Sequence, residues 1–226
     1  MCLFVLFGIM AAGAVPCHAQ ETVFNVPSPD VLDKGKIYGE VDIPTAFQQS
    51  TSSFEPRVMT GLGKRVEVGL NFIGVSAPDT GQLSVSPTIK WMPYKGANGW
   101  SVFVGDNAFF PVRQRQYTAG NYAYAVVSKT FSEGTRVSAG GYEFTAHVVA
   151  PDRRTGIQAT LEQTVTKSLS LAADWFSGAH SSGNLTPGIV LKATSRFTFY
   201  GAYELGNSCL TSGNHALLIE LGYNFH

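Results

Sequence analysis

The chain of 226 residues is 44% hydrophobic and 12% aromatic but only 14% charged, and its 16 basic and 16 acidic residues leave a formal net charge of zero. A balanced charge argues against a nucleic-acid-binding protein, which usually carries a basic excess, and the hydrophobic content argues against a disordered chain. Soluble domains average about 25% charged residues, so this chain is short of charge, and its 24 glycines indicate β structure with many turns.

The first twenty residues contain no Lys, Arg, Asp or Glu and form an apolar run that ends in small residues. This outline is typical of a secretory signal peptide. We predict a signal peptide over residues 1–19, cleaved after Ala19, with a retained anchor or a lipid-modified Cys17 as the alternatives. Cleavage removes Cys2 and Cys17, so Cys209 is left as a single thiol and no internal disulfide is expected.

Residues 20–35 have the sequence QETVFNVPSPDVLDKG, which contains two prolines and several turn formers. Such a composition predicts an N-terminal extension rather than a strand. We expect the extension to lie outside the folded body of the protein, and insertion into that body as a short plug is the alternative.

The rest of the chain, residues 36–226, alternates apolar and polar side chains, which is the mark of strands with two different faces. In residues 65–72, RVEVGLNF, the apolar side chains share one face, and Arg65, Glu67 and Asn71 share the other. No stretch shows a sustained helical period. The pattern predicts twelve strands, over 36–47, 54–62, 65–74, 83–93, 99–109, 120–131, 135–144, 156–165, 167–177, 185–194, 196–205 and 214–225.

Most of these strands approach the ~9–11 residues that a tilted strand needs to cross a bilayer. Their connections alternate between tight turns, such as 63–64 and 194–195, and longer polar loops, such as 110–119 and 145–155. Short turns on one rim and long loops on the other are the layout of a bacterial outer-membrane barrel. We therefore predict an all-β fold, an antiparallel up-and-down transmembrane β-barrel of about twelve strands over 36–226, with the N-terminal extension in the periplasm.

Two alternatives to this architecture stay open. The strands 99–109, 120–131 and 135–144 have ambiguous faces, so barrels of about ten or fourteen strands are also compatible with the sequence. A soluble β-sandwich or ligand-binding barrel also buries an apolar face.

Aromatic residues near the strand ends favour the membrane barrel, because rings with one wet and one apolar side suit a membrane–water interface. The predicted belt at the short-turn rim comprises Trp91, Tyr94, Trp100, Phe131, Phe197, Tyr223 and Phe225. The predicted belt at the other rim comprises Phe47, Phe54, Phe72, Phe109, Phe110, Tyr122, Trp175 and Tyr203.

The last strand alternates most regularly, and its apolar face is made by Leu217, Ile219, Leu221, Tyr223 and Phe225. This pattern resembles the C-terminal assembly signal of Gram-negative outer-membrane barrels, in which a terminal aromatic residue follows alternating apolar residues. The resemblance is to the porin-like class and extends to the strand-and-loop layout of residues 36–226. It implies a bacterial outer-membrane location and recognition by the barrel-insertion machinery. His226 is a departure, since it follows the aromatic residue that is normally last.

If the apolar faces meet lipid, the opposite faces line the lumen. Opposite charges in a narrow lumen are expected to pair, because burying an unpaired charge is costly. In one interpretation such pairs fill a sealed interior, and in the other they line a water-filled path with weak ion selectivity. The predicted lumen-lining residues are Lys36, Glu40, Asp42, Glu55, Arg57, Arg65, Glu67, Lys90, Glu162, Asp174, Lys192, Arg196, Glu204 and Glu220.

Two of the long loops carry paired arginines. Arg113 and Arg115 lie in the loop 110–119, and Arg153 and Arg154 lie in the loop 145–155. Because arginine forks suit phosphate, these residues are candidates for contacts with lipopolysaccharide or for narrowing the mouth of the barrel. Ordinary solvated loop charges are the alternative.

One feature of the sequence raises the question of an enzyme. His180 and Ser182, in GAHSSGN, have the spacing of the His-x-Ser pair in which outer-membrane lipid hydrolases resemble one another. A hydrolase also needs a third group to orient the histidine. Asp174 faces inward by parity and Asn184 is only a sequence neighbour, so we predict that the protein is not an enzyme.

The sequence thus favours a porin-like channel for passive passage of ions or small polar solutes, in contact with outer-membrane lipid and lipopolysaccharide. We expect no cofactor, and the scattered histidines predict no metal site. A sealed barrel with a structural, anchoring or surface-binding role is the alternative, and a lipid hydrolase that uses His180 and Ser182 is the less favoured one.

Overall fold

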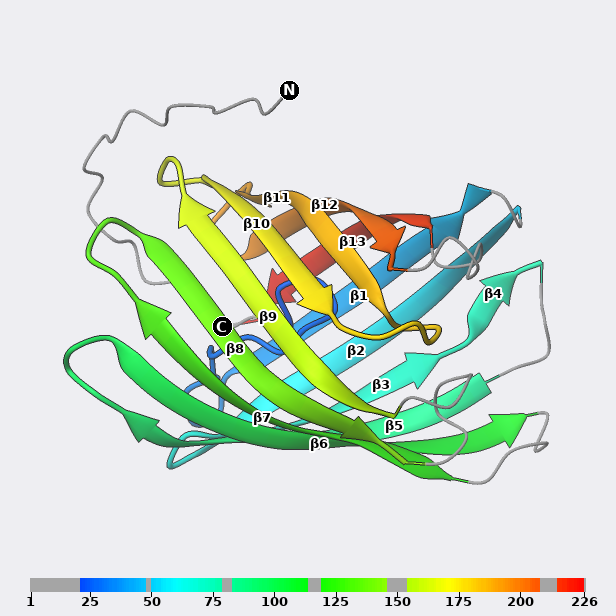
Figure 1. The fold of residues 1–226 in the computed structure, drawn as a ribbon, viewed down its shortest axis with the longest axis horizontal. Coiled ribbons are helices and arrows are strands. Elements are labelled where there is room, and N and C mark those ends of the chain that lie inside the picture. Colours follow the sequence, from blue (N-terminus) through cyan, green and yellow to red (C-terminus); the bar gives the residue numbers. More distant parts are fainter. Residues whose placement is uncertain are drawn as a thin grey trace.

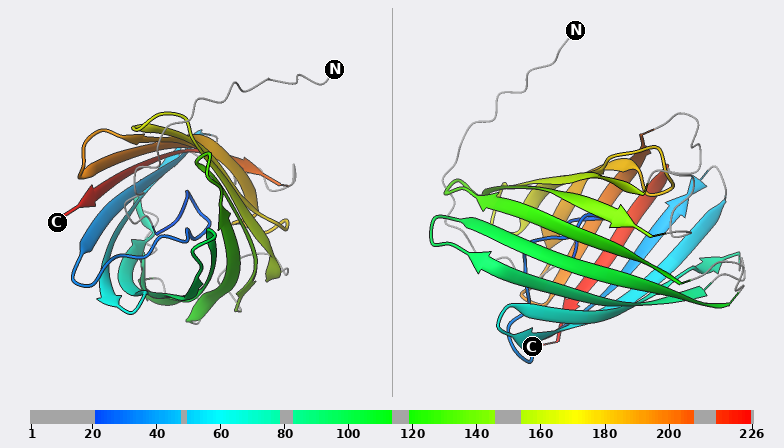
Figure 2. Two further views of the ribbon diagram at one scale, coloured as in Figure 1. Left: turned by 90° about the vertical axis from the view of Figure 1, so that its left-hand side faces the viewer. Right: turned by 60° about the horizontal axis from the view of Figure 1, so that its bottom comes forward.

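The computed structural model of the chain describes residues 21–47, 50–78, 83–113, 119–145, 154–207 and 215–225. Strand β1 pairs with both β2 and β13, so the antiparallel sheet closes into a barrel (Figures 1 and 2). The described strand segments are β1 (Ile37–Ala46), β2 (Thr51–Gly63), β3 (Val66–Ile73), β4 (Val75–Ala77), β5 (Leu83–Lys95), β6 (Trp100–Arg113), β7 (Gly120–Thr130), β8 (Thr135–Phe144), β9 (Thr155–Thr164), β10 (Leu169–Phe176), β11 (Asn184–Lys192), β12 (Phe197–Gly206) and β13 (Ala216–Asn224).

The segments β3 and β4 make one strand of the barrel, because both pair with β2. Gly74 separates them with a φ of 92°, in the left-handed region that favours glycine, and the register against β2 shifts by one residue there. Counting β3 and β4 together, the described residues form twelve barrel strands. The predicted all-β, antiparallel up-and-down barrel of about twelve strands is confirmed.

Short turns and longer connections separate to the two rims of the barrel, as predicted. The turn rim carries 64–65, 96–99, 131–134, 165–168 and 193–196, together with the ends of β1 and β13. At the other rim, called here the loop rim, lie the strand ends Ala46, Ala77, Arg113, Phe144, Phe176 and Gly206, after which the longer connections of the sequence follow. Several boundaries differ. β6 continues to Arg113, so residues 110–113, which the sequence places in a loop, belong to the strand, and β2 begins at Thr51 and not at 54. Among the described residues, no helix is long and apolar enough to cross a membrane.

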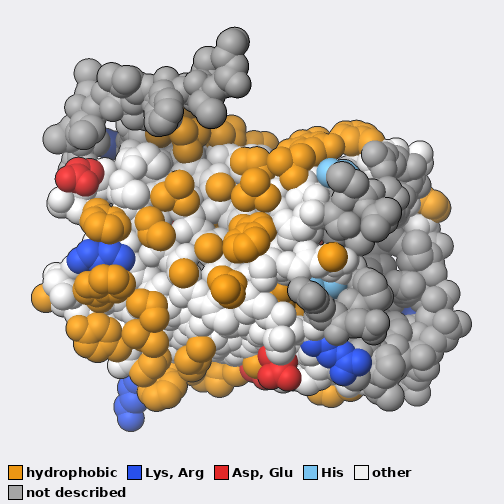
Figure 3. Space-filling view, in the orientation of Figure 1, with side chains coloured by type: hydrophobic (Ala, Val, Ile, Leu, Met, Phe, Trp, Pro, Cys, Tyr) orange, Lys and Arg blue, Asp and Glu red, His pale blue; other side chains and the backbone are white. Residues whose placement is uncertain are grey.

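The outer wall of the barrel is apolar. Alternate residues of each strand point outward, and large hydrophobic side chains there are widely exposed, as at Ile89 (49%), Leu161 (51%) and Ile157 (59%). Figure 3 shows hydrophobic side chains across one side of the wall, with charged side chains mostly towards its ends. An exposed apolar surface of this extent suits lipid and not water. The outward residues of β13 are those of the predicted C-terminal signal.

Most of the predicted aromatic residues lie on this outer wall near a rim, as at Trp100, Phe131, Phe54 and Trp175. The exceptions are Tyr122, which is buried inside the barrel at 5% exposure, and Phe109, which packs against the same interior cluster. The sequence-based prediction of an outer position is wrong for both, because alternation does not show which face of the strands 99–109 and 120–131 points outward. In each, aromatic residues face the lumen.

The hydrophobic core of the protein lies inside the barrel, in two main clusters. The first, called here the aromatic cluster, comprises Val26, Met92, Phe103, Tyr122, Tyr124, Val126, Tyr142, Phe144 and Phe176. The second, called here the aliphatic cluster, comprises Val23, Phe24, Ala172, Val190, Tyr200, Ala202 and Leu218. Each cluster includes residues of the segment before β1, so that segment belongs to the core.

Candidate functional site

The lumen is occupied by the N-terminal segment, residues 21–35, which Figure 2 shows as the blue trace inside the barrel. The segment turns back on itself as a tight hairpin: the Val23 N–H donates to the Val26 carbonyl at 2.8 Å, and the Ser28 N–H donates to the Glu21 carbonyl at 2.9 Å. Val23 and Val26 are 0% exposed. The described part of the extension therefore lies inside the barrel as a plug, which is the alternative stated above, and not outside the folded body. The predicted signal peptide lies outside the described residues.

The tip of this hairpin is anchored by Asp174 on β10. One carboxylate oxygen of Asp174 accepts the backbone N–H groups of Phe24, Asn25 and Val26, at 3.1, 2.6 and 2.8 Å. Successive N–H groups that converge on one point form a nest for an anion. Asp174 is 1% exposed, and the hairpin supplies hydrogen bonds that offset the burial of its charge.

A second contact holds the hairpin tip to the neighbouring strands. The Asn25 side chain donates to Glu204 on β12 at 2.9 Å and to Thr186 on β11 at 3.1 Å. Glu204 also accepts a longer bond of 3.5 Å from Asn184. The tip is therefore held by side chains of β10, β11 and β12.

The other end of the segment is held near the turn rim. Arg136 on β8 donates to Asp30 at 2.8 Å and makes a two-bond pair with Glu162 on β9, at 2.7 and 2.6 Å. The Leu32 N–H donates to Glu67 on β3 at 2.8 Å, and Glu67 pairs with Lys90 at 3.1 Å. The segment is thus tied to opposite parts of the wall, and the lumen is bridged.

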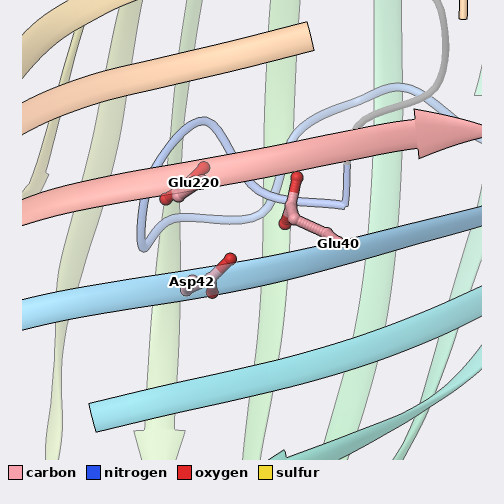
Figure 4. Close-up of side chains that lie close together, drawn as sticks. All are labelled: Glu40, Asp42 and Glu220. Atoms are coloured by element: carbon pink, nitrogen blue, oxygen red, sulfur yellow. The ribbon is translucent and has the colours of Figure 1, made fainter. Parts of the chain in front are cut away.

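Between these two anchorages lies a group of acidic residues around one guanidinium. Arg57 on β2 contacts Glu21 of the segment at 3.2 Å and Glu40 on β1 at 3.5 Å, and it also contacts Asp42. Glu40, Asp42 and Glu220 each place one carboxylate oxygen within 4.8 Å of those of the other two. Figure 4 shows these three side chains, which come from β1 and β13.

The predicted lumen-lining residues divide into three groups by position. Those buried inside the barrel are Glu40, Asp42, Glu67, Lys90, Asp174 and Glu220. Those half-buried inside it are Glu55, Arg57, Glu162, Lys192 and Glu204. Exposed at the turn rim, beyond the ends of the strands, are Lys36, Arg65 and Arg196. Strand alternation fixes the direction of a side chain only within the strand, and these last three lie outside strands.

Several residues that hold the segment were not singled out from the sequence: Glu21, Asp30 and Arg136. The signal for Arg136 was present, because Arg136, Ser138 and Tyr142 fall on one face of β8. The alternation of β8 is hard to recognise because, apart from Val137, the opposite face carries small residues and Glu143. Glu21 and Asp30 lie in an irregular segment, where no periodicity indicates a direction.

Of the predicted loop arginines, two are described. Arg113 ends β6 and Arg154 directly precedes β9, and both are exposed. Arg115 and Arg153 lie outside the described residues. The expected contact with lipopolysaccharide stays a prediction.

His180 and Ser182 do not face each other as a base and a nucleophile. The Nδ1 atom of His180 accepts the backbone N–H of Ser182 at 3.2 Å, and Nε2 lies 2.7 Å from the Tyr142 hydroxyl. The Tyr142 hydroxyl donates to the Ser177 carbonyl, so Nε2 is the donor to it. His180 is 0% exposed, and burial lowers the pKa of His180, which keeps the ring neutral at pH 7. His180 thus fastens the β10–β11 connection to β8.

Because only the side chain of His180 takes part in these contacts, substitutions of His180 and Ser182 are expected to differ in their effect on stability. His180→Ala is expected to destabilise the barrel by about 1–3 kcal/mol, because it removes a partner from the buried Tyr142 hydroxyl and from the part-buried Ser182 N–H. Ser182→Ala is expected to change stability by less than about 0.5 kcal/mol, because the contact uses its backbone. Urea unfolding of the refolded protein measures both. A lipid-hydrolysis activity that both substitutions abolish would contradict this assignment.

A cavity of about 420 Å³ opens at the turn rim, beside Pro29 and Asp30 of the segment. Its wall includes Asp30, Arg136 and Glu162, and lysines at 95, 167 and 192 surround it. This vestibule is bounded by the same residues that hold the segment.

No protein-family model matches the sequence, and no curated protein matches it. Among solved structures, the KdgM porin matches with a TM-score of 0.58 and 10% identity, over 84% of this chain and 99% of that one. Outer membrane phospholipase A from Escherichia coli matches with a TM-score of 0.47 and 12% identity, over 87% of this chain and 94% of that one. At these identities the likeness is one of fold, that of outer-membrane β-barrels.

Proposed function

We propose that the protein is a bacterial outer-membrane channel for ions or small polar solutes and that its own N-terminal segment closes it. The observation that carries the proposal is the occupation of the lumen by residues 21–35, which the wall holds through polar contacts as well as through the two apolar clusters. A wall that offers carboxylates and cations to this segment offers them to water and solutes when the segment leaves. The fold likeness to the KdgM porin supports the channel.

The connection between segment and barrel supports a removable plug. Along the described chain, backbone pairing of the segment with the wall is confined to its last residues, where Lys34 and Gly35 meet Gly61 of β2. Gly35 has a φ of 77°, which favours glycine, and apart from its chain neighbours no atom lies within 4 Å of where a β-carbon would stand. The hairpin can therefore swing about Gly35 without breaking any strand pair of the barrel.

A sealed barrel is the second candidate. The aromatic cluster supports it, because Tyr122, Phe144 and Phe176 pack together inside the wall, with ring centroids 4.8 to 6.3 Å apart. Side chains of this size narrow the lumen even without the segment. In this case the protein anchors or binds at the cell surface.

Conductance across planar bilayers distinguishes the two candidates. We compare the chain that begins at residue 20 with a variant that lacks residues 21–34. The intact chain is expected to be mostly silent, and the variant is expected to give discrete steps with weak ion selectivity, because the lining carries both signs of charge. Heat-modifiable migration in a detergent gel verifies that the variant is folded. An insulating bilayer with a correctly folded variant would favour the sealed barrel.

The other elements of the proposal concern the environment of the barrel. We propose that the alternating face of β13 serves recognition by the insertion machinery, and that exposed loop arginines such as Arg113 and Arg154 contact lipopolysaccharide. The engagement of His180 with Tyr142 and the Ser182 backbone supports a structural role for it and no enzymatic activity.

A further inference from the structure

We propose that the protein binds a divalent cation of the calcium type inside the barrel, between Glu40 and Asp42 of β1 and Glu220 of β13. One carboxylate oxygen of each residue lies within 4.8 Å of those of the other two, and all three residues are buried, with exposures of 3%, 4% and 0%. They come from the first and last strands, where the barrel closes (Figure 4). Oxygen atoms of carboxylates are the ligands that Ca²⁺ prefers.

The register of the strands forces these charges together. Asp42 stands directly opposite Glu220 across the β1–β13 pair, and directly opposite Glu55 across the β1–β2 pair. Like charges at directly opposed positions destabilise a sheet. Three adjacent strands thus place carboxylates at one level of the lumen, which calls for a compensating positive charge.

The charges nearby do not supply it. Arg57 is shared among Glu21, Glu40 and Asp42. Lys90 pairs with Glu67 at 3.1 Å and donates a long bond of 3.4 Å to the Glu21 carbonyl, so its charge is engaged mainly by Glu67. The guanidinium of Arg57 therefore faces four carboxylates, those of Glu21, Glu40, Asp42 and Glu220. Burial of the excess negative charge is costly unless a cation joins them.

Carboxylate oxygen atoms that accept no hydrogen bond mark the site. Within the described part of the chain, neither carboxylate oxygen of Glu220 has a hydrogen-bond partner, and Glu40 Oε1 and Asp42 Oδ1 also have none. The remaining oxygen of Glu40 accepts the Tyr38 hydroxyl at 2.5 Å, which holds that side chain in place. Both oxygen atoms of Glu220 and Oδ1 of Asp42 are thus available to an ion, while Glu40 Oε1 accepts no hydrogen bond but lies 3.5 Å from Arg57 Nε. Water can complete the shell of the ion.

A bound ion joins the two strands that close the barrel, so its effect is measurable as stability. The full chain is refolded in a non-ionic detergent with Ca²⁺ or with EDTA, and its thermal unfolding is followed. We expect Ca²⁺ to raise the unfolding midpoint, because an ion that binds only the folded state stabilises it. We expect Glu220→Gln to abolish this rise and to leave the EDTA form at least as stable as the parent. Asp42→Asn serves as a second variant if Glu220→Gln does not fold.

Terbium luminescence reports binding directly. The Tyr38 hydroxyl donates a hydrogen bond to Glu40, so the Tyr38 ring is near enough to sensitise a terbium ion held by that carboxylate. The signal is expected in the parent, with an affinity weakened by more than about tenfold in Glu220→Gln. The matched control is Glu143→Gln, because Glu143 is an exposed carboxylate on the outer face of β8. Equal midpoints in Ca²⁺ and EDTA without luminescence would overturn the proposal. So would stabilisation by acid alone, which indicates that protons neutralise the cluster, or a Ca²⁺ response that Glu220→Gln retains.

Discussion

Arg57→Ala is expected to lower the free energy of unfolding by about 3–5 kcal/mol, the usual cost of removing one partner from a buried ion pair. The side chain of Arg57 is only 10% exposed and contacts Glu21, Glu40 and Asp42. Its removal leaves these carboxylates close together with no guanidinium between them. Urea unfolding in lipid vesicles, followed by tryptophan fluorescence, measures the change, and EDTA in the buffer prevents a metal ion from replacing the lost charge.

Arg65→Ala is the matched control for this experiment. Arg65 is exposed in the turn between β2 and β3, so its loss is expected to change stability by less than about 0.5 kcal/mol. Adding Glu40→Gln to Arg57→Ala is expected to recover part of the loss, since it removes one of the carboxylates left unpaired. A change within about 1 kcal/mol for Arg57→Ala, the range of an exposed ion pair, would refute the assignment of Arg57 as the main counter-charge.

The closed wall of this barrel is predictable because its pattern has a physical cause. A strand between lipid and a polar lumen must alternate apolar and polar side chains. The bounds and faces of a strand with clear alternation, such as β3 or β13, can therefore be read from its sequence. A tight turn preserves the parity from one strand to the next, and a slip of one residue reverses every side chain. The strand count therefore follows from the turns and not from any single strand.

The same reasoning fails in β6, β7 and β8 because both of their faces depart from the rule. On β7, Tyr122 and Tyr124 point inward and are buried, while Ala123 and Ala125 point outward. Size and hydrophobicity then no longer indicate lipid. The reversal has a reason in the fold: the inward rings of these strands pack around Val26 of the segment, which alternation cannot reveal.

The position of residues 21–35 depends on contacts that span most of the chain. Asp174 lies 148 residues beyond Val26, and Arg136 lies 106 beyond Asp30. Neither a proline-rich segment nor an isolated inward carboxylate identifies its partner. An inward Asp174 is predictable from parity, whereas three backbone N–H groups that converge on it require the folded barrel.

Asp174→Ala is expected to loosen the hairpin tip and to open the lumen intermittently. One oxygen of Asp174 accepts the N–H groups of Phe24, Asn25 and Val26. A hydrogen bond to a charged group contributes about 1.5–3 kcal/mol. Loss of only two such bonds at the lower value, about 3 kcal/mol, already corresponds to roughly 100-fold faster amide exchange. Hydrogen exchange of residues 24–26, measured beside residues of β13 as an internal reference, tests this.

Asp174→Asn distinguishes charge from shape in the same experiment. The amide keeps an oxygen acceptor in place but loses the negative charge, so its exchange rates are expected to fall between those of the parent and Asp174→Ala. Rates unchanged in both variants would mean that burial of Val23, Phe24 and Val26 in the two clusters holds the hairpin without the carboxylate. If exchange accelerates and single-channel openings appear together, the anchor at Asp174 is the element that keeps the barrel closed, and the polar lining beneath it is the path that it closes.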